Sequence, residues 1–340
     1  MRLANTLEKA LFGFRLRSSS RFGRLQRRVL PRKALFNVSN LCNANCVFCA
    51  YQYSKEPKLF MADDLFEEIC RQFIAFRPES WISLTPLVGE PLTDPHLFDK
   101  IALAKRLGAE RIESYTNAIL LKRHHRAILE SGLDELCISF PDFDPTEFTL
   151  IFRNEKYQQA LEGIHSLLAL KKQRDHPLGI RINLRSRRPL EQITREPDYL
   201  RFVKPFVDTG LATLDTTTAF DNWGGLITQS DLPEGMRLAS ENPRKRRIPC
   251  MRLFKFIALQ EGDIKLCGCR FKGSIHDELT IGNIHRQDLA AIWFGEAAFA
   301  IRERFRLGLF PEVCVDCSHY IPMRRPYFAD PRNTLPERDP

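Results

Sequence analysis

Apolar positions between residues 34 and 217 switch repeatedly between the 3.6-residue repeat of helices and the two-residue alternation of strands. The breaks fall on turn-forming residues such as Asp94-Pro95, Gly108, Gly132 and Gly210. Helical periodicity covers 63–76, 96–107, 122–131, 154–173 and 197–204, and strand-like runs cover 34–38, 81–84, 111–116, 135–140, 179–184 and 212–217. This alternation predicts an α/β fold, a partial (β/α)6 barrel of the TIM type whose site lies at the carboxyl ends of its strands.

The alternation stops at Trp223-Gly224-Gly225, and a Ser-, Pro- and Arg-rich stretch follows. From Pro249 onwards the pattern predicts a hairpin of 254–259 and 264–267, followed by helices. We therefore expect a small C-terminal domain of hairpin and helices beside the barrel. The predicted organisation is an extension (1–33), a barrel (34–225), a linker (226–248), the small domain (249–324) and a Pro-rich tail (325–340).

Composition excludes a disordered, collagenous or low-complexity chain, because 44% of residues are hydrophobic and 27% are charged. The net charge of +9 comes entirely from residues 1–33, which hold ten basic residues and one acid and leave 41 of each elsewhere. Leu and Phe are interleaved with Arg there, as in a segment that lies on an anionic membrane surface. An arm that packs on the body, a nucleic-acid contact and a transit peptide are the alternatives.

No apolar run approaches the ~20 residues of a membrane span, and no signal peptide opens the chain. We therefore expect a cytoplasmic protein whose basic arm can contact a membrane surface. The ten cysteines fall mainly in clusters at either side of a long middle section. A reducing compartment and metal ligation explain such clusters better than a disulfide scaffold.

The first cluster, Cys42, Cys46 and Cys49, directly follows the first predicted strand. Iron–sulfur clusters normally take four Cys, so three in one loop leave one iron open to another ligand. A zinc site with a distant fourth ligand is the alternative. The run Asn40-Leu41-Cys42-Asn43-Ala44-Asn45-Cys46-Val47-Phe48-Cys49 resembles the signature of radical S-adenosylmethionine (SAM) enzymes. That resemblance implies a 4Fe–4S cluster that binds SAM and cleaves it to a 5′-deoxyadenosyl radical, with Phe48 near the adenine.

Further positions strengthen this resemblance. Leu87-Val88-Gly89-Glu90-Pro91 is similar to the family's Gly-Gly-Glu-Pro stretch, although Val88 replaces the first glycine. Thr116-Asn117-Ala118 resembles the family's Thr-Asn-Gly, and Ser139 falls where a serine often contacts SAM. On the fifth strand, Arg181, Asn183 and Arg185 alternate with apolar residues and would face the lumen. The cofactor-binding residues implied by the resemblance are Phe48, Gly89, Glu90, Asn117, Ser139, Arg181 and Asn183.

A second set of cysteines lies in the small domain, at 250, 267, 269, 314 and 317. Their spacing also suits a zinc ribbon. With the upstream signature, they resemble the SPASM/twitch extension of radical SAM enzymes, which holds an auxiliary 4Fe–4S cluster. Cys250, Cys267, Cys314 and Cys317 would then be the ligands, with Cys269 as an alternative to Cys267.

A fully ligated auxiliary cluster suits electron transfer, so we expect an oxidoreductase. One-auxiliary-cluster relatives include cyclitol and aminoglycoside-type alcohol dehydrogenases, which favours oxidation of a sugar- or cyclitol-like substrate. Asp215 and Asp221 are candidate bases near the end of the sixth strand. The alternatives are peptide modification and epimerisation, in which Cys137, on the same strand face as Ser139, would donate a hydrogen atom.

Reduction of the first cluster requires a partner such as flavodoxin or ferredoxin. A different class of protein, a zinc-ribbon module that binds nucleic acid, would explain the basic arm and four cysteines. It would not explain the Cys42 loop, Gly89-Glu90 and the alternation of strands and helices, so the nucleic-acid signal is weak. The sequence names no substrate, because a fold and its cofactor do not fix what enters the pocket.

Overall fold

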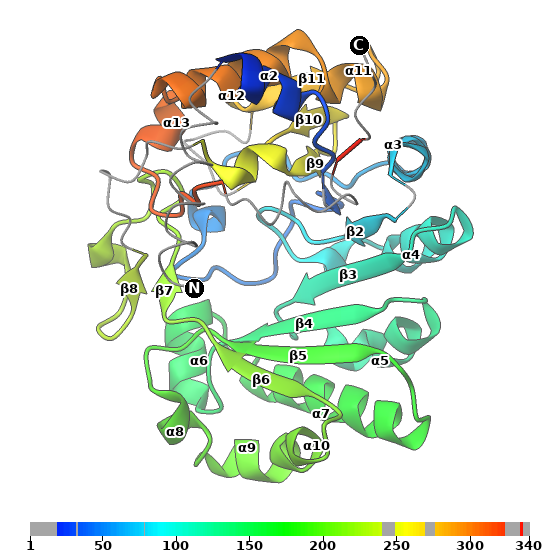
Figure 1. Cartoon of the computed structure of the whole chain (residues 1–340). Helices are drawn as coiled ribbons and strands as arrows, with labels where there is room; N and C mark the ends of the chain where they lie inside the picture. The colour runs from blue at the N-terminus through cyan, green and yellow to red at the C-terminus, as the bar shows by residue number, and fades with distance from the viewer. Residues whose placement is uncertain are drawn as a thin grey trace, which may run out of the picture.

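The computed structural model describes residues 19–31, 33–77, 79–239, 249–268, 276–323 and 334–335. Its main feature is one nine-stranded sheet in the order β11-β10-β9-β1-β2-β3-β4-β5-β6 (Figure 1). Strands β1 to β6 are parallel throughout, as predicted. They are Lys33–Phe36, Trp81–Ser83, Arg111–Thr116, Glu135–Phe140, Gly179–Leu184 and Thr213–Thr216.

The α/β fold with a partial barrel is confirmed. Helices pack along the outside of the parallel strands, with α3 against α4 and α5 against α7. The helices of this part are α3 (Asp63–Phe76), α4 (Leu97–Arg106), α5 (Leu121–Glu130), α6 (Pro145–Phe152), α7 (Tyr157–Gln173), α8 (Leu190–Ile193), α9 (Pro197–Phe202) and α10 (Lys204–Asp208).

The helices differ from the sequence prediction over 197–204, at α6 and at the short α8. The helix expected over 197–204 is interrupted at Val203, because Pro205 has no backbone N–H to donate to the carbonyl of Arg201 and occupies the first turn of a new helix, α10. Helix α6 was not predicted, although its start carries a recognisable cap. Asp144 accepts hydrogen bonds from the amides of Thr146 and Glu147, and Pro145 occupies the first turn.

The predicted small domain does not form a separate sheet. Its strand β9 (Phe256–Ala258) pairs in parallel with β1, and β10 (Asp263–Lys265) and β11 (Thr280–Asn283) continue the sheet antiparallel. The expected hairpin is therefore present, turning at Gly262, and it extends the barrel at its β1 edge. Helices α11 (Leu289–Trp293), α12 (Glu296–Leu307) and α13 (Glu312–Val315) cover this end of the sheet.

The stretch predicted as a linker, 226–248, is folded over its described part. Ile227, Leu232 and Met236 are buried, and β7 (Ala219–Phe220) pairs with β8 (Arg237–Leu238). Residues 240–248 lie outside the described residues. The segment after β6 therefore forms a wall of the molecule beside the barrel mouth.

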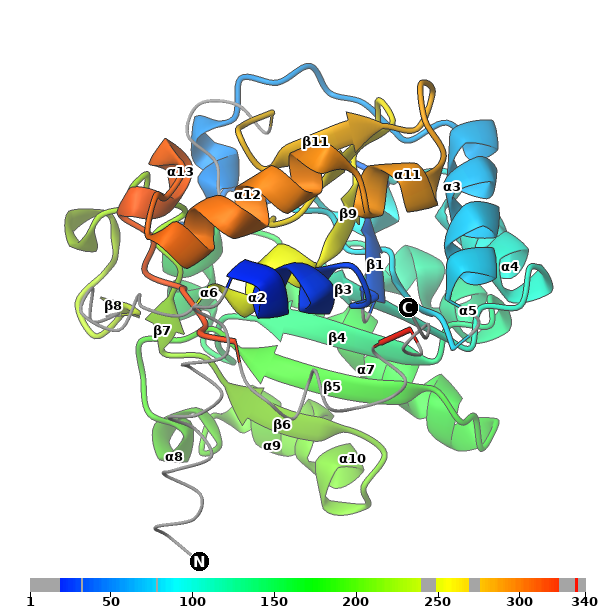
Figure 2. The same ribbon diagram turned by 45° about the horizontal axis from the view of Figure 1, so that its top comes forward.

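The predicted N-terminal extension is, from Ser19, part of the fold. Helix α2 (Ser19–Gln26) lies alongside α12 (Figure 2). The side chains of Phe22 and Val29 are fully buried. The Trp293 indole donates a hydrogen bond to the carbonyl of Val29 (2.8 Å). The described part of the arm therefore packs on the body, which was one of the alternatives. Residues 1–18 lie outside the described part.

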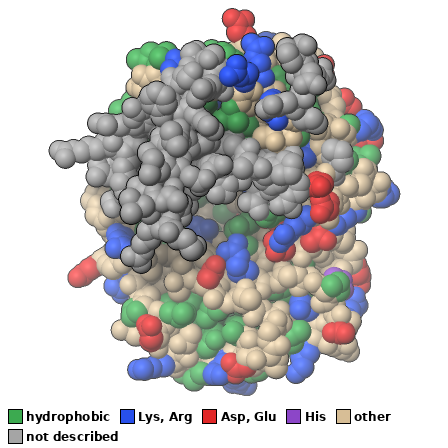
Figure 3. Space-filling view, in the orientation of Figure 1, with side chains coloured by type: hydrophobic (Ala, Val, Ile, Leu, Met, Phe, Trp, Pro, Cys, Tyr) green, Lys and Arg blue, Asp and Glu red, His purple; other side chains and the backbone are tan. Residues whose placement is uncertain are grey.

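The predicted tail is described only at 334–335, where Thr334 pairs with Val29. Acidic and basic side chains are interspersed over the described part of one face of the molecule (Figure 3), in keeping with the balanced charge of residues 34–340. None of the described helices is both long enough and apolar enough to cross a membrane.

Candidate active site

The loop that follows β1 carries Cys42, Cys46 and Cys49, and all three line a cavity of about 330 Å³ at the carboxyl ends of the strands. Its backbone is held by the end of α6, where the carbonyls of Phe152 and Ile151 accept hydrogen bonds from the amides of Asn45 (3.1 Å) and Val47 (3.0 Å). The unpredicted helix α6 therefore fixes the conformation of the cysteine loop.

The three thiols are free and lie close enough to influence one another. Burial raises the pKa of Cys42 to about 12, and it raises those of Cys46 and Cys49 as well. The Cys49 thiolate raises the pKa of Cys42 and of Cys46, and the Cys42 thiolate also raises that of Cys46. The Arg185 guanidinium acts in the opposite direction on Cys46 and Cys49. Such a group becomes a stable set of thiolates only when it binds a cation.

Thiolates are the ligands that iron–sulfur clusters prefer. Among the residues that the structure describes, no three His, Cys, Asp or Glu side chains converge closely enough to surround one metal ion. The ligands of a four-iron cluster bind different irons and therefore stay further apart than the ligands of a single ion. Three half-buried thiols around a cavity of this size fit a cluster with one open iron.

The segment after β2 lies directly against the cysteine loop. The amide of Glu90 donates a hydrogen bond to the carbonyl of Leu41 (2.8 Å). Gly89 has φ +147°, and a Cβ there would lie 2.5 Å from the carbonyl oxygen of Ser39. Only glycine allows the two backbones to approach this closely.

Replacing Gly89 with alanine is therefore expected to destabilise the fold by about 2–4 kcal/mol and to loosen the cysteine loop. Urea unfolding would measure the loss of stability. Gly210 also has positive φ (+74°), but a Cβ there meets nothing within 4 Å, so Gly210→Ala controls for backbone strain alone. Equal losses in the two variants would contradict the close-approach argument.

Glu90 is a buried carboxylate that joins the cysteine loop to β3. It accepts hydrogen bonds from the Thr116 hydroxyl (2.8 Å) and from the amides of Asn117 (2.8 Å) and Leu92 (3.2 Å). Burial still raises the pKa of Glu90 to about 7. A cationic group placed beside this carboxylate would offset the cost of burying its charge.

Asn117 connects the same network to a cysteine. Its amide nitrogen donates a hydrogen bond to the Asn43 side chain (2.6 Å) and lies 3.8 Å from Cys42 Sγ. Val88, where the sequence departs from the family pattern, is buried against Ala50 and Ile257 and does not line the cavity. At this departure from the family pattern, the Val88 side chain makes an apolar contact that joins the cysteine loop to β9.

Not all predicted lumen residues reach this cavity. Arg181 donates hydrogen bonds to Asp215 (3.0 Å) and to the Tyr115 hydroxyl (2.9 Å), and Asn183 also binds Asp215 (2.6 Å). None of Arg181, Asn183 and Asp215 lines the cavity, whereas Ser139 does. The assignment of Arg181 or Asn183 to the SAM carboxylate therefore lacks support, because both side chains bind Asp215 and neither lines the cavity.

Cys137 lines a second cavity, of about 360 Å³, toward the other end of the strands. The same cavity is lined by Arg181 and Tyr115, and Tyr115 lines both cavities. Burial raises the pKa of Cys137 to about 11. The thiol is thus placed on the lumen face, as predicted, but outside the cavity of the three cysteines.

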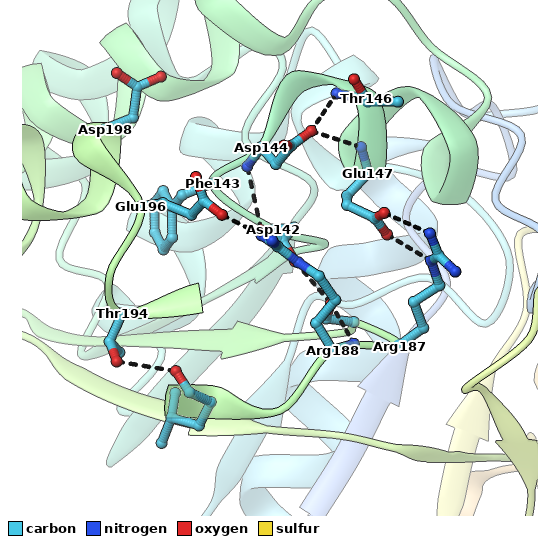
Figure 4. Close-up of polar contacts among 12 residues, drawn as sticks. Asp142, Phe143, Asp144, Thr146, Glu147, Arg187, Arg188, Thr194, Glu196 and Asp198 are labelled. Carbon is cyan, nitrogen blue, oxygen red and sulfur yellow. Dashed lines mark hydrogen bonds and ion pairs between the residues drawn. The ribbon is translucent and has the colours of Figure 1, made fainter. Parts of the chain in front are cut away.

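Arg185 is the basic residue that the sequence analysis did not choose. It lines the three-cysteine cavity, its guanidinium lies 5.4 Å from the centre of the Phe48 ring, and its buried Nε has no hydrogen-bond partner. The next two arginines are saturated, Arg187 by Glu147 and Arg188 by Asp142 and Glu196 (Figure 4). Arg185 belongs to the same alternating set of polar residues as Arg181, so the alternation along this strand could have identified it as a cavity residue.

Aromatic side chains complete the cavity wall. Phe48 stacks on Phe220, with ring centres 4.8 Å apart and planes inclined by 22°. The Trp223 indole donates a hydrogen bond to the carbonyl of Phe48 (3.0 Å), and Asp221 also lines the cavity. Phe220 and Trp223 lie well beyond the motifs of the first half of the chain, and no local signal marked them.

The predicted auxiliary ligands Cys250, Cys267, Cys314 and Cys317 are all buried. Burial raises the pKa of Cys250 to about 11, and the Cys267 thiol raises it further. Cys250 pairs with Pro322, a few residues beyond Cys317. Four buried thiols gathered in this way fit a second, fully ligated cluster, and Cys269, the alternative ligand, lies outside the described residues.

Both auxiliary segments touch the wall of the first cavity. A Cβ on Gly268, beside Cys267, would lie 2.1 Å from the cavity-lining Leu87 side chain. The hydroxyl of Ser318, beside Cys317, donates a hydrogen bond to Asp221 (3.4 Å). One layer of side chains therefore separates the auxiliary cysteine segments from the cavity.

Two family models match the chain, the radical SAM superfamily over residues 36–184 and the SPASM iron–sulfur cluster-binding domain over residues 250–318. The chain belongs to the radical SAM superfamily. It is an enzyme whose cofactors are a 4Fe–4S cluster that binds SAM and an auxiliary iron–sulfur cluster in the SPASM domain. The alternative of a zinc-ribbon nucleic-acid-binding protein is therefore set aside.

Among curated proteins, the GTP 3′,8-cyclase of Limosilactobacillus fermentum is 30% identical over 138 residues, which are 39% of this chain and 41% of the cyclase. The GTP 3′,8-cyclase of Chlorobaculum tepidum is 28% identical over 134 residues, which are 39% of each chain. The matched segment thus spans about two fifths of these relatives.

Among solved structures, BtrN in complex with AdoMet and 2-DOIA matches with a TM-score of 0.55 at 15% identity, over 85% of this chain and 94% of BtrN. SuiB of Streptococcus suis bound to its precursor peptide SuiA matches with a TM-score of 0.54 at 14% identity, over 80% of this chain and 66% of SuiB. At these identities the similarity shows the fold of the radical SAM enzyme and not its substrate.

Proposed function

We propose that this radical SAM enzyme dehydrogenates a sugar- or cyclitol-like small molecule, with the auxiliary cluster as electron acceptor. The observation that carries the proposal is the contact of both auxiliary cysteine segments with the cavity wall, through Gly268 on Leu87 and Ser318 on Asp221. A substrate in the cavity would lie within one side-chain layer of the acceptor. BtrN, whose fold is similar, is complexed with AdoMet and 2-DOIA.

The cofactors would supply a 5′-deoxyadenosyl radical that removes a hydrogen atom from an alcohol carbon, and an acceptor for the electron left behind. The protein must then take one proton from the hydroxyl group, so that the alcohol loses two hydrogens and becomes a ketone. One further electron, from flavodoxin or ferredoxin, would reduce the first cluster in each turnover. The ligands would be Cys42, Cys46 and Cys49 for that cluster, and Cys250, Cys267, Cys314 and Cys317 for the acceptor.

Asp221 is the better of the two predicted bases. It lines the cavity, whereas Asp215 does not line it and accepts hydrogen bonds from Arg181 and Asn183. We expect Asp221→Asn to lower the rate of product formation about 10²–10³-fold with SAM binding unchanged, because general base catalysis contributes about this much. Asp215→Asn should change the rate less than tenfold, and steady-state kinetics that reversed this order would move the base to Asp215.

We further propose that Glu90 holds the amino group of SAM and Arg185 its carboxylate, with Phe48 beside the adenine. Gly89, Asn117 and Ser139 complete this pocket through their backbone and polar contacts. The unpartnered Arg185 Nε and the buried Glu90 carboxylate are groups of opposite charge within one cavity. They match the two opposite charges of an amino-acid end group.

Replacing Arg185 with glutamine is expected to weaken SAM binding about 10–100-fold, since a charge-assisted hydrogen bond contributes roughly 1.5–3 kcal/mol. Arg181→Gln is the matched comparison, because Arg181 was the sequence-based choice and is bound to Asp215. Equilibrium binding of SAM to the reconstituted protein measures both. A larger loss in Arg181→Gln than in Arg185→Gln would restore the original assignment.

The proposed reaction is tested with candidate polyols deuterated at single carbons. Transfer of one deuterium into 5′-deoxyadenosine, with a product two mass units lighter than the unlabelled substrate, supports dehydrogenation. A product with the mass of the unlabelled substrate, in which a hydrogen derived from solvent replaces the deuterium on carbon, indicates epimerisation. For that second reaction Cys137 is the candidate hydrogen-atom donor; it lines the neighbouring cavity, which shares Tyr115 with the cavity of the three cysteines.

A further inference from the structure

The residues 220–223, here called the bridge segment, contact both cysteine-bearing parts of the chain. On one side they hold Phe48, which lies between Cys46 and Cys49. Phe220 stacks on its ring (4.8 Å between centres), and the Trp223 indole donates a hydrogen bond to its carbonyl (3.0 Å). The ring and the backbone of Phe48 are therefore both fixed from the same short segment.

On the other side, Asn222 binds Asp316, which lies between Cys314 and Cys317, and Ser318, which follows Cys317. Its backbone amide donates to the Ser318 hydroxyl (2.8 Å), its side-chain amide donates to the carbonyl of Asp316 (2.5 Å), and its side-chain oxygen accepts from the amide of Ser318 (3.0 Å). A single side chain and its backbone thus anchor the bridge segment to the auxiliary cysteines.

The backbone of the bridge segment is strained. Trp223 has φ +52°, a left-handed conformation that is unfavourable for a residue with a bulky side chain, and it is followed by two glycines with positive φ. The Asp221 carboxylate accepts a hydrogen bond from the amide of Trp223 (3.1 Å) and holds this turn. The indole also packs against the cluster of Ala50, Val88, Ile257 and Leu259, which joins the cysteine loop to β9.

Strained backbone persists where surrounding contacts determine it and where geometry matters for function. Here the strain turns the Trp223 indole toward Phe48 while Asn222 faces the auxiliary segment. We propose that Trp223 is a positioning residue, and that the bridge segment transmits the arrangement of the Cys314–Cys317 segment to the cysteine loop and the SAM-binding cavity. In consequence, the affinity for SAM depends on contacts made at the auxiliary site.

The proposal is tested on the anaerobically reconstituted holoenzyme without substrate, so the outcome is independent of the dehydrogenation proposal. Trp223→Phe keeps a ring but removes the hydrogen bond to Phe48, and Asn222→Ala removes the anchor. Asn283→Ala is the matched control, because Asn283 also makes side-chain hydrogen bonds to a backbone carbonyl and a backbone amide, in the β10–β11 region away from the cavity. The readouts are hydrogen–deuterium exchange by mass spectrometry and the SAM dissociation constant.

Trp223→Phe should raise exchange in residues 46–53 and weaken SAM binding at least about fivefold, the effect of one lost hydrogen bond. Asn222→Ala should raise exchange in both 46–53 and 314–320 and weaken SAM binding similarly. In the double variant, the fold loss of SAM affinity should be smaller than the product of the two single-variant losses, because both residues act through the same bridge segment. Asn283→Ala should leave exchange in both segments and SAM binding unchanged.

The proposal is overturned if exchange and SAM affinity in Trp223→Phe stay within twofold of the wild type. It is also overturned if Asn222→Ala loosens only 314–320, or if the two losses multiply in full. Thermal unfolding verifies that each variant is folded. Should Asn222→Ala fail that check, Asn222→Asp replaces it, since it keeps the acceptor for Ser318, loses the donor to Asp316 and adds a negative charge beside that carbonyl.

Discussion

Replacement of Cys46 by alanine is expected to abolish reductive cleavage of SAM, with a loss of at least about three orders of magnitude, or about 4 kcal/mol. Cys46 is half-buried in the cavity wall beside the two other thiols, and its loss leaves too few ligands for the first cluster. Iron content should fall from about eight to about four per chain, because the auxiliary cysteines are untouched. An iron assay and chromatographic detection of 5′-deoxyadenosine measure the two effects.

Cys70→Ala is the matched control for this variant. Cys70 is a buried cysteine that lies in α3 among apolar side chains. This variant should keep its iron and its SAM cleavage and lose only some stability. If Cys46→Ala retained SAM cleavage, or if Cys70→Ala lost iron, the assignment of the cluster to the Cys42–Cys49 loop would be wrong.

Replacement of Cys317 by alanine is expected to separate SAM cleavage from substrate oxidation. The first cluster keeps its three ligands, so 5′-deoxyadenosine should still form, but oxidised product should fall at least about a hundredfold relative to it. The reason is that the electron of the substrate radical has no acceptor. Quantifying 5′-deoxyadenosine and product in the same reaction gives their ratio, and iron should fall to about four per chain.

Cys137→Ala provides the control in the lumen. Cys137 is buried but lies in the second cavity, so its loss should leave the iron content and the ratio of product to 5′-deoxyadenosine unchanged. A variant Cys317→Ala with a normal ratio would remove the auxiliary cluster from the proposed oxidation. Loss of product in Cys137→Ala with a normal ratio in Cys317→Ala would favour epimerisation instead.

The sequence predicted the parallel strands accurately, since β3, β4 and β5 begin and end at the expected residues. These strands are buried, bounded by glycines or helices, and their pattern is local. The pairing of β9 with β1 was not predicted, because it joins 34–36 to 256–258 and no local pattern encodes a partner so distant in the chain. The same reason hid Phe220 and Trp223 from the sequence analysis of the cavity.

Alternation along β5 identified the lumen face but not the depth of each residue. Arg181, Asn183 and Arg185 share that face, yet only Arg185 reaches the cavity, while Arg181 is paired with Asp215 from β6. The amphipathic arm posed a similar problem. The amphipathic pattern is the same whether the apolar face of the segment meets a lipid surface or another helix. In this fold α2 lies against α12, and Phe22 is buried.

The central claim is that the Cys42–Cys49 loop holds a cluster whose open iron binds and cleaves SAM. The most direct test is to reconstitute the protein without oxygen, reduce it with dithionite, add SAM and measure methionine and 5′-deoxyadenosine. We expect both products in equal amounts, only with reductant, from protein that holds about eight iron per chain. Intact SAM after reduction, or a metal content of zinc alone, would contradict the account.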